Sequence, residues 1–174
     1  MSKKISWITQ TAICIALLVA AQVITASFAN TFITGTLVNL VLIISVIICG
    51  ITSGLIVAMV SPVLARLLGI GPLWILIPFI MLGNISLVVV WYIISHRKGS
   101  HKNQYILAWL HGAIAKFLIL YIGIVKFAIP VLLHLPEKKA AMISAAFSLP
   151  QFATALAGGA LALVILPVIK KAEV

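Results

Sequence analysis

Long apolar stretches, separated by short groups of polar, glycine and proline residues, run along nearly the whole chain. An α-helix needs about 20 mainly apolar residues to cross a bilayer, within a range of about 17–25. By this measure the pattern predicts an all-α fold with six membrane-spanning helices. The expected spans are residues 5–28, 32–49, 54–68, 73–95, 105–127 and 140–169.

The breaks between the stretches contain residues that are typical of turns. We find no internal repeat, and we therefore expect a single six-helix domain over residues 1–174. Pro150 lies inside the last predicted span, where it is expected to bend the helix because proline cannot donate a backbone hydrogen bond. The breaks are Asn30-Thr31 and residues 50–54, 69–72, 96–103 and 130–139.

The composition requires lipid around most of the chain. Hydrophobic residues make up 64% and charged residues 8%, whereas an ordinary soluble domain is about half apolar and about a quarter charged. Lys and Arg number 12 against two acids, Glu137 and Glu173, which gives a net charge of +10. The basic residues lie near the ends of apolar stretches, where they set topology and meet lipid headgroups, so nucleic-acid binding is not expected.

The distribution of Lys and Arg predicts the orientation, because positively charged loops stay in the cytoplasm. An even number of spans with the N-terminus inside leaves seven basic residues on the inner side and three on the outer side. We therefore expect a multi-pass protein of the cell membrane with both termini in the cytoplasm. The inner residues are Lys3, Lys4, Arg97, Lys98, Lys102, Lys170 and Lys171, and the outer ones are Arg66, Lys138 and Lys139.

The chain lacks the residues that catalysis or ATP hydrolysis would need. It contains no Asp and no Gly-Lys-Ser/Thr sequence, so it cannot provide the usual ATP and Mg²⁺ site. Its four histidines are scattered and have no acidic companion, which argues against a metal site. We therefore predict that the chain is not an enzyme and holds no cofactor, and that any transport is driven by another subunit.

A few polar or aromatic residues within the apolar stretches are candidates for a binding site. Lys116 lies near the middle of the fifth predicted span, where a charge is costly and usually functional. It can contact a ligand with an anionic or carbonyl group, or it can extend toward the interface or bond helix carbonyls. The amides can bind a ligand or join helices, and Trp74 can stack on a ring or anchor the interface. The predicted substrate-binding residues are Gln22, Asn39, Trp74, Asn84, Lys116, Gln151 and Thr154.

Three alanines in the first predicted span, Ala12, Ala16 and Ala20, are spaced by four residues. Because an α-helix has 3.6 residues per turn, they form one narrow stripe. Small residues at this spacing let another membrane helix approach closely. The stripe is either a docking face for a partner protein or an internal packing face.

Six spans in fewer than 180 residues, cytoplasmic termini and the alanine stripe together resemble a substrate-binding (S) component of an energy-coupling factor (ECF) transporter. Three short sequences are similar to the branch of this family that binds vitamins or their precursors. These sequences are Leu37-Val38-Asn39-Leu40, Met81-Leu82-Gly83-Asn84 and Pro150-Gln151-Phe152-Ala153-Thr154-Ala155-Leu156.

The resemblance implies that the protein binds a vitamin or precursor from outside and docks through its first helix onto a membrane-embedded coupling subunit. That subunit is driven by two cytoplasmic ATPases, which use the ATP. The resemblance also implies that residues 29–31 and 69–73 cover the site, and that the whole S component tilts in the bilayer to present the site inward.

Our first expectation for the substrate is a neutral ring of the hydroxymethylpyrimidine or pyridoxine type, because Asn84, Gln151 and Trp74 suit hydrogen bonding and stacking. Pantothenate is the second, since its carboxylate gives Lys116 a partner. A small membrane protein with an assembly or pore role is the alternative from another class.

Overall fold

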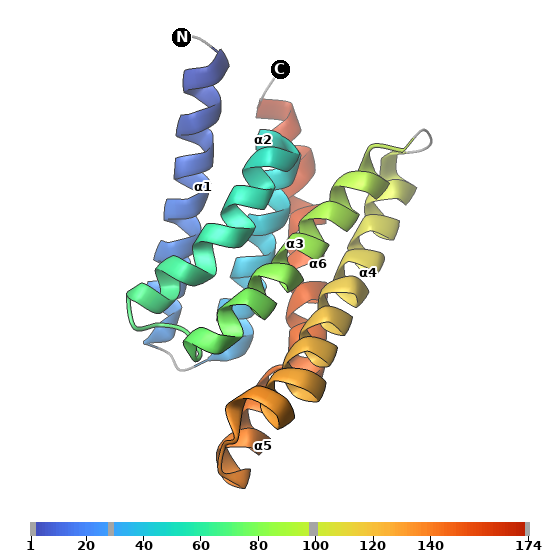
Figure 1. Ribbon diagram of the computed structural model, residues 1–174. Helices are drawn as coiled ribbons and strands as arrows, with labels where there is room; N and C mark the ends of the chain where they lie inside the picture. Colours follow the sequence, from blue (N-terminus) through green and yellow to red (C-terminus); the bar gives the residue numbers. More distant parts are fainter. Residues whose placement is uncertain (1–2, 28–29, 98–100, 173–174) are drawn as a thin grey trace.

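The computed structural model describes residues 3–27, 30–97 and 101–172, which form a bundle of helices (Figure 1). Five helical stretches of the described residues are long and apolar enough to cross a membrane, and no strand occurs among these residues. The prediction of an all-α membrane protein is confirmed. In chain order the elements are α1 (Lys3–Ala26), α2 (Thr31–Leu67), the 3₁₀-helix η1 (Trp74–Leu76), α3 (Ile77–Ser95), α4 (His101–Leu120), the π-helix η2 (Tyr121–Leu133), α5 (Glu137–Ala146) and α6 (Leu149–Ala172).

Helix α2 reverses its direction at Gly50, so its two halves lie side by side (Figure 1). Gly50 has φ +83° and ψ 175°, a backbone conformation that is essentially restricted to glycine. A Cβ atom built on Gly54 would lie 3.2 Å from the Cα of Val46, although eight residues of straight helix would separate these positions by about 12 Å. The expected break at residues 50–54 is therefore a single-residue turn.

The last third of the chain differs from the prediction. Helical structure continues from α4 through Pro130 and ends at Leu133, inside the expected break at residues 130–139. The last predicted span is divided into α5 and α6, with a turn at residues 147–148. Pro150 is the second residue of α6, a position where the missing N–H is not needed. The predicted bend at Pro150 is therefore wrong.

The core lies around α2, whose Leu42, Ile43 and Val46 are almost completely buried. They belong to one cluster with α3 side chains such as Val88 and Trp91. In contrast, many large apolar side chains lie exposed on the outer surface of the bundle. Membrane lipid is the solvent that such a surface requires.

Glycine lets α6 approach α2 closely where the two helices cross. A Cβ atom on Gly158 would lie 2.6 Å from the carbonyl oxygen of Thr36 and 2.7 Å from the Cβ of Asn39. Only a residue without a side chain fits this approach. The contact places Thr154, one turn earlier on α6, beside Asn39 of α2.

Candidate functional site

A cavity of about 440 Å³ lies at the end of the bundle where several helix connections meet. Its wall includes Asn30 from the α1–α2 connection, Gly71 from the α2–η1 connection and Phe147 from the α5–α6 connection. This end is opposite the N- and C-termini (Figure 1). The volume falls within the range of about 300–1,000 Å³ that is usual for small-molecule sites.

Lys116 reaches the cavity wall from α4 and is only 3% exposed. Its Nζ donates to Oδ1 of Asn39 at 2.6 Å and to Oδ1 of Asn84 at 2.7 Å. Both acceptors are neutral amides that are themselves buried. The buried ammonium is thus hydrogen-bonded by side chains of α2 and α3 and does not lie free among apolar residues.

Further hydrogen bonds fix the orientation of both amides. Asn84 donates through Nδ2 to the carbonyl oxygen of Ala58 at 3.4 Å. Asn39 donates through Nδ2 to Oγ1 of Thr154 at 3.4 Å, and Thr154 donates to the carbonyl oxygen of Gln151 at 3.1 Å. One polar network therefore joins both halves of α2 to α3, α4 and α6, and it holds the two amide oxygens toward Lys116.

The structure brings most of the predicted substrate-binding residues together. Gln22, Asn84, Lys116 and Gln151 line the cavity. Asn39 and Thr154 are not among the described residues that line the cavity. Asn39 is hydrogen-bonded to Lys116, which lines it, and Thr154 is hydrogen-bonded to Asn39.

Trp74 is placed apart from the other candidates. It does not occur among the described residues that line the cavity, and 51% of its surface is exposed. The guanidinium carbon of Arg66 lies 5.8 Å from the centre of its ring. This arrangement is typical of an aromatic residue at an interface that is stabilised by a nearby cation.

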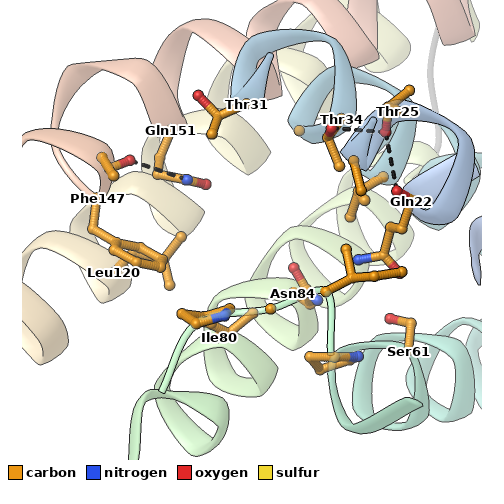
Figure 2. A pocket seen from close by; sticks show the side chains of 18 of the residues that line it. Gln22, Thr25, Thr31, Thr34, Ser61, Ile80, Asn84, Leu120, Phe147 and Gln151 are labelled. Carbon is orange, nitrogen blue, oxygen red and sulfur yellow. Dashed lines mark hydrogen bonds between the residues drawn. The ribbon is translucent and has the colours of Figure 1, made fainter. Parts of the chain in front are cut away.

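The cavity also has polar lining residues that the sequence did not single out, among them Thr25, Thr34 and Ser61. Figure 2 shows Gln22, Asn84 and Ser61 on one side of the cavity, with Gln151 and Phe147 on the other. Two buried atoms, Oε1 of Gln22 and Oγ of Ser61, have no hydrogen-bond partner in the described part of the chain. Buried polar atoms of this kind are normally hydrogen-bonded, so they are candidates for contact with a ligand.

The side chains of the cavity wall are of the kinds that bind a small molecule. Glu137, the one acid among the described residues, is exposed at the start of α5 and does not line the cavity. The described residues also contain no group of three or more His, Cys, Asp or Glu side chains able to hold a metal ion. The wall instead offers amides, hydroxyls and one ammonium, which can orient a polar molecule.

The alanine stripe faces outward. Ala12, Ala16 and Ala20 are all exposed, whereas Cys14 and Leu18 of the same helix are buried against the bundle. α1 packs chiefly against α2. The stripe is therefore not part of the packing within this chain, and a partner helix would have free access to it.

Most of the described residues that the resemblance placed over the site line the cavity, but Gly69 and Leu73 are not among the lining residues. Asn30, Thr31, Ile70, Gly71 and Pro72 line it. Ala29, which belongs to the first of the two expected loops, lies outside the described residues.

A comparison with protein families finds a match over most of the chain. The family model described as "ECF transporter, substrate-specific component" matches residues 8–170. The chain belongs to this family. No curated protein and no solved structure matches the chain significantly.

Family membership confirms several predictions from the sequence. The protein is an S component of an ECF transporter and a multi-pass membrane protein, and it is a transport subunit, not an enzyme. S components work together with a membrane-embedded coupling subunit and ATPases. The alternative of a small assembly or pore protein has no support from this match.

Proposed function

We propose that the protein captures a small water-soluble vitamin or vitamin precursor outside the cell membrane and delivers it to an ECF transport complex. The observation that carries this proposal is the 440 Å³ cavity, whose mainly apolar wall includes the buried polar residues Ser61, Asn84 and Lys116. Membrane helices rarely bury so many amides and a charge without a function. The family match supplies the transport role.

The proposed topology has six spans, with both halves of α2 crossing the bilayer and both termini in the cytoplasm. The reversal at Gly50 supports two crossings by α2. The excess of Lys and Arg at the termini and in the α3–α4 connection supports a cytoplasmic position for that end. The cavity, at the opposite end, would then open outward and receive substrate from outside.

We propose that residues 1–174 act as one substrate-binding domain that holds no cofactor, and that ATP is used by two cytoplasmic ATPases. The coupling subunit would dock on Ala12, Ala16 and Ala20. The exposure of all three residues supports this assignment, because close helix packing in lipid depends on small side chains. A tilt of the whole S component would then present the cavity to the cytoplasmic side.

Two substrate chemistries remain candidates within this function. A neutral ring of the hydroxymethylpyrimidine or pyridoxine type would use Phe147 for stacking and Asn84, Gln22 and Gln151 for hydrogen bonds. Trp74, on which the ring expectation partly depended, is not among the described residues that line the cavity, so this version of the proposal does not use it. Pantothenate would bring a carboxylate to Lys116.

The function is tested by identifying what the protein binds. The protein is purified from cells grown in rich medium, the bound small molecules are extracted, and mass spectrometry compares them with those from a parallel purification of the Asn84→Leu variant. We expect one water-soluble vitamin or precursor in stoichiometric amount with the wild type and much less with the variant. A folded wild type that retains no such compound, and that none of the water-soluble vitamins stabilises against heat, would refute the proposal.

A further inference from the structure

We propose that the ligand of the cavity is a small carboxylate, that Lys116 is its counter-charge, and that Asn39 and Asn84 are the residues that position this lysine. The inference rests on the proposed function and narrows its substrate to an organic acid. It starts from the hydrogen bonds of Lys116 and from the lack of an acidic side chain near it.

The ammonium group of Lys116 has one donor left for the cavity. A lysine Nζ carries three N–H donors, and among the described residues it has two acceptors, the amide oxygens of Asn39 and Asn84. Lys116 is also part of the cavity wall, and our proposal assigns this third donor to a bound molecule. A carboxylate there would receive a charge-assisted hydrogen bond, which is stronger than a bond between neutral groups.

The two amides satisfy hydrogen bonds of Lys116 but do not neutralise its charge. A buried cation is normally paired with an anion, because desolvation is expensive. The chain has two acids in all, and Glu137, the one in the described part, is exposed at the start of α5. A positive charge held in place and lacking a counter-ion favours an anionic ligand over a neutral one.

Hydrogen-bond acceptors, in contrast to the donor on Lys116, are present elsewhere on the wall. Oε1 of Gln22 can only accept a hydrogen bond, and Oγ of Ser61 can accept or donate one. Both atoms are buried and have no partner among the described residues, and both residues line the cavity. A ligand that suits both regions carries a carboxylate for Lys116 and O–H or N–H groups for Gln22 and Ser61. A purely hydrocarbon acid would leave these two atoms unpaired.

The sharpest test introduces a competing negative charge without changing shape. Asn39→Asp replaces the amide oxygen that lies 2.6 Å from Nζ with a carboxylate oxygen. Asn39 is not among the described lining residues, so the change would neutralise Lys116 from behind the wall. Lys116→Gln removes the charge itself. Lys126→Gln is the matched control, because Lys126 is exposed and lies over the ring of Tyr121, away from the wall.

The probes are pairs of compounds that differ in one group, a carboxylate in the acid and an uncharged polar group in its analogue. Pantothenate is compared with its alcohol, pantothenol, and nicotinate with nicotinamide; hydroxymethylpyrimidine and pyridoxine serve as neutral rings. Binding to the purified wild type and variants is measured by calorimetric titration. The compound that co-purifies with the wild type is added to the series together with its amide or alcohol analogue.

We expect that one acid binds the wild type and that its neutral analogue binds at least about 30-fold more weakly. Lys116→Gln should weaken binding of the acid by about 30-fold to several thousand-fold. Asn39→Asp should weaken it by at least about tenfold, and Lys126→Gln should leave it unchanged. Neither Asn39→Asp nor Lys116→Gln should abolish the weak binding of the neutral analogue.

Two results would overturn the assignment. If a neutral compound is the tight ligand and binds Lys116→Gln and Asn39→Asp as well as it binds the wild type, Lys116 is structural and the carboxylate proposal fails, while the proposed function stands. If the wild type is folded, retains no small molecule and is not stabilised against heat by any of the water-soluble vitamins, the proposed function fails and the carboxylate proposal fails with it. Thermal unfolding of each variant shows whether a loss of binding comes from a loss of folding.

Discussion

Gly158 provides a direct test of the packing that holds the site together. A methyl group at this position would lie 2.6 Å from the carbonyl oxygen of Thr36, whereas carbon–oxygen contacts in proteins begin at about 3.3 Å. The Thr36 oxygen belongs to the backbone of α2, and the next nearest atom, the Cβ of Asn39 at 2.7 Å, is bonded directly to that backbone, so no flexible side-chain end can move aside. Gly158→Ala should therefore push α6 away from α2 by about 0.7 Å.

The displacement affects both stability and the site. Overpacking of this kind costs about 1–3 kcal/mol, and the better helix propensity of alanine returns about 0.5–1 kcal/mol. The net loss, which is up to about 2.5 kcal/mol, should lower the Tm by up to about 10 °C. The bond from Asn39 to Thr154 is already 3.4 Å long and would exceed the usual limit. Ligand affinity should then fall several-fold, because Asn39 also orients Lys116.

The assay is thermal unfolding of the purified protein, followed by tryptophan fluorescence, together with titration of the co-purified ligand. Gly112→Ala on α4 is the matched control. Its new methyl group would lie 3.0 Å from the end of the Leu87 side chain, which needs to shift by only a few tenths of an ångström, and its next nearest atom, the Leu87 carbonyl oxygen at 3.7 Å, is at an ordinary contact distance. We expect the control to equal or exceed the stability of the wild type. A Gly158→Ala protein as stable as the control, with unchanged affinity, would refute the close approach of α2 and α6.

Further substitutions test three other parts of the structure. Asn84→Ala and Gln151→Ala should each weaken ligand binding by about tenfold or more, because a polar group of the buried ligand is left without its hydrogen bond. If calorimetry shows unchanged affinity for both variants, these amides only join helices. Ala16→Trp should prevent co-purification with the coupling subunit and leave ligand binding intact, because residue 16 is exposed on the outside of α1. The control, Val164→Trp on the exposed surface of α6, should preserve the complex. Gly50→Ala should lower the free energy of unfolding by about 1–3 kcal/mol, and unfolding as in the wild type would show that the turn needs no glycine.

The sequence predicts the helical content well, because a bilayer leaves few structures that satisfy every backbone polar group. It predicts connections less reliably. The group Gly50 to Gly54 contains several turn residues, yet one glycine with positive φ is sufficient to reverse the chain. The sequence also did not predict the division of the last span. Residues 140–146 belong to α5, but they continue the apolar pattern of the residues that follow.

The candidate site could be predicted in part for a similar reason. Lys116 is conspicuous as a single charge in an apolar stretch, and Asn39 and Asn84 as amides in others. That all three meet depends on tertiary structure, since the amides are 77 and 32 residues away from Lys116 along the chain. Ser61 gave no signal, because a serine in a helix often bonds its own backbone. Trp74 is not among the described residues that line the cavity, and the sequence could not indicate this, because stacking on a ligand and anchoring at an interface use the same side chain.

Helix α1 contributes residues to both proposed binding surfaces, so ligand binding and docking of the coupling subunit can influence each other. Ala12, Ala16 and Ala20 occupy its exposed face, while Gln22 lies farther along the helix at the cavity. A ligand that bonds Oε1 of Gln22 contacts the helix on which the coupling subunit would dock. Since linked binding events affect each other equally, any influence of the ligand on docking must appear as an influence of the coupling subunit on ligand affinity. The two can be compared by measuring affinity with and without the coupling subunit.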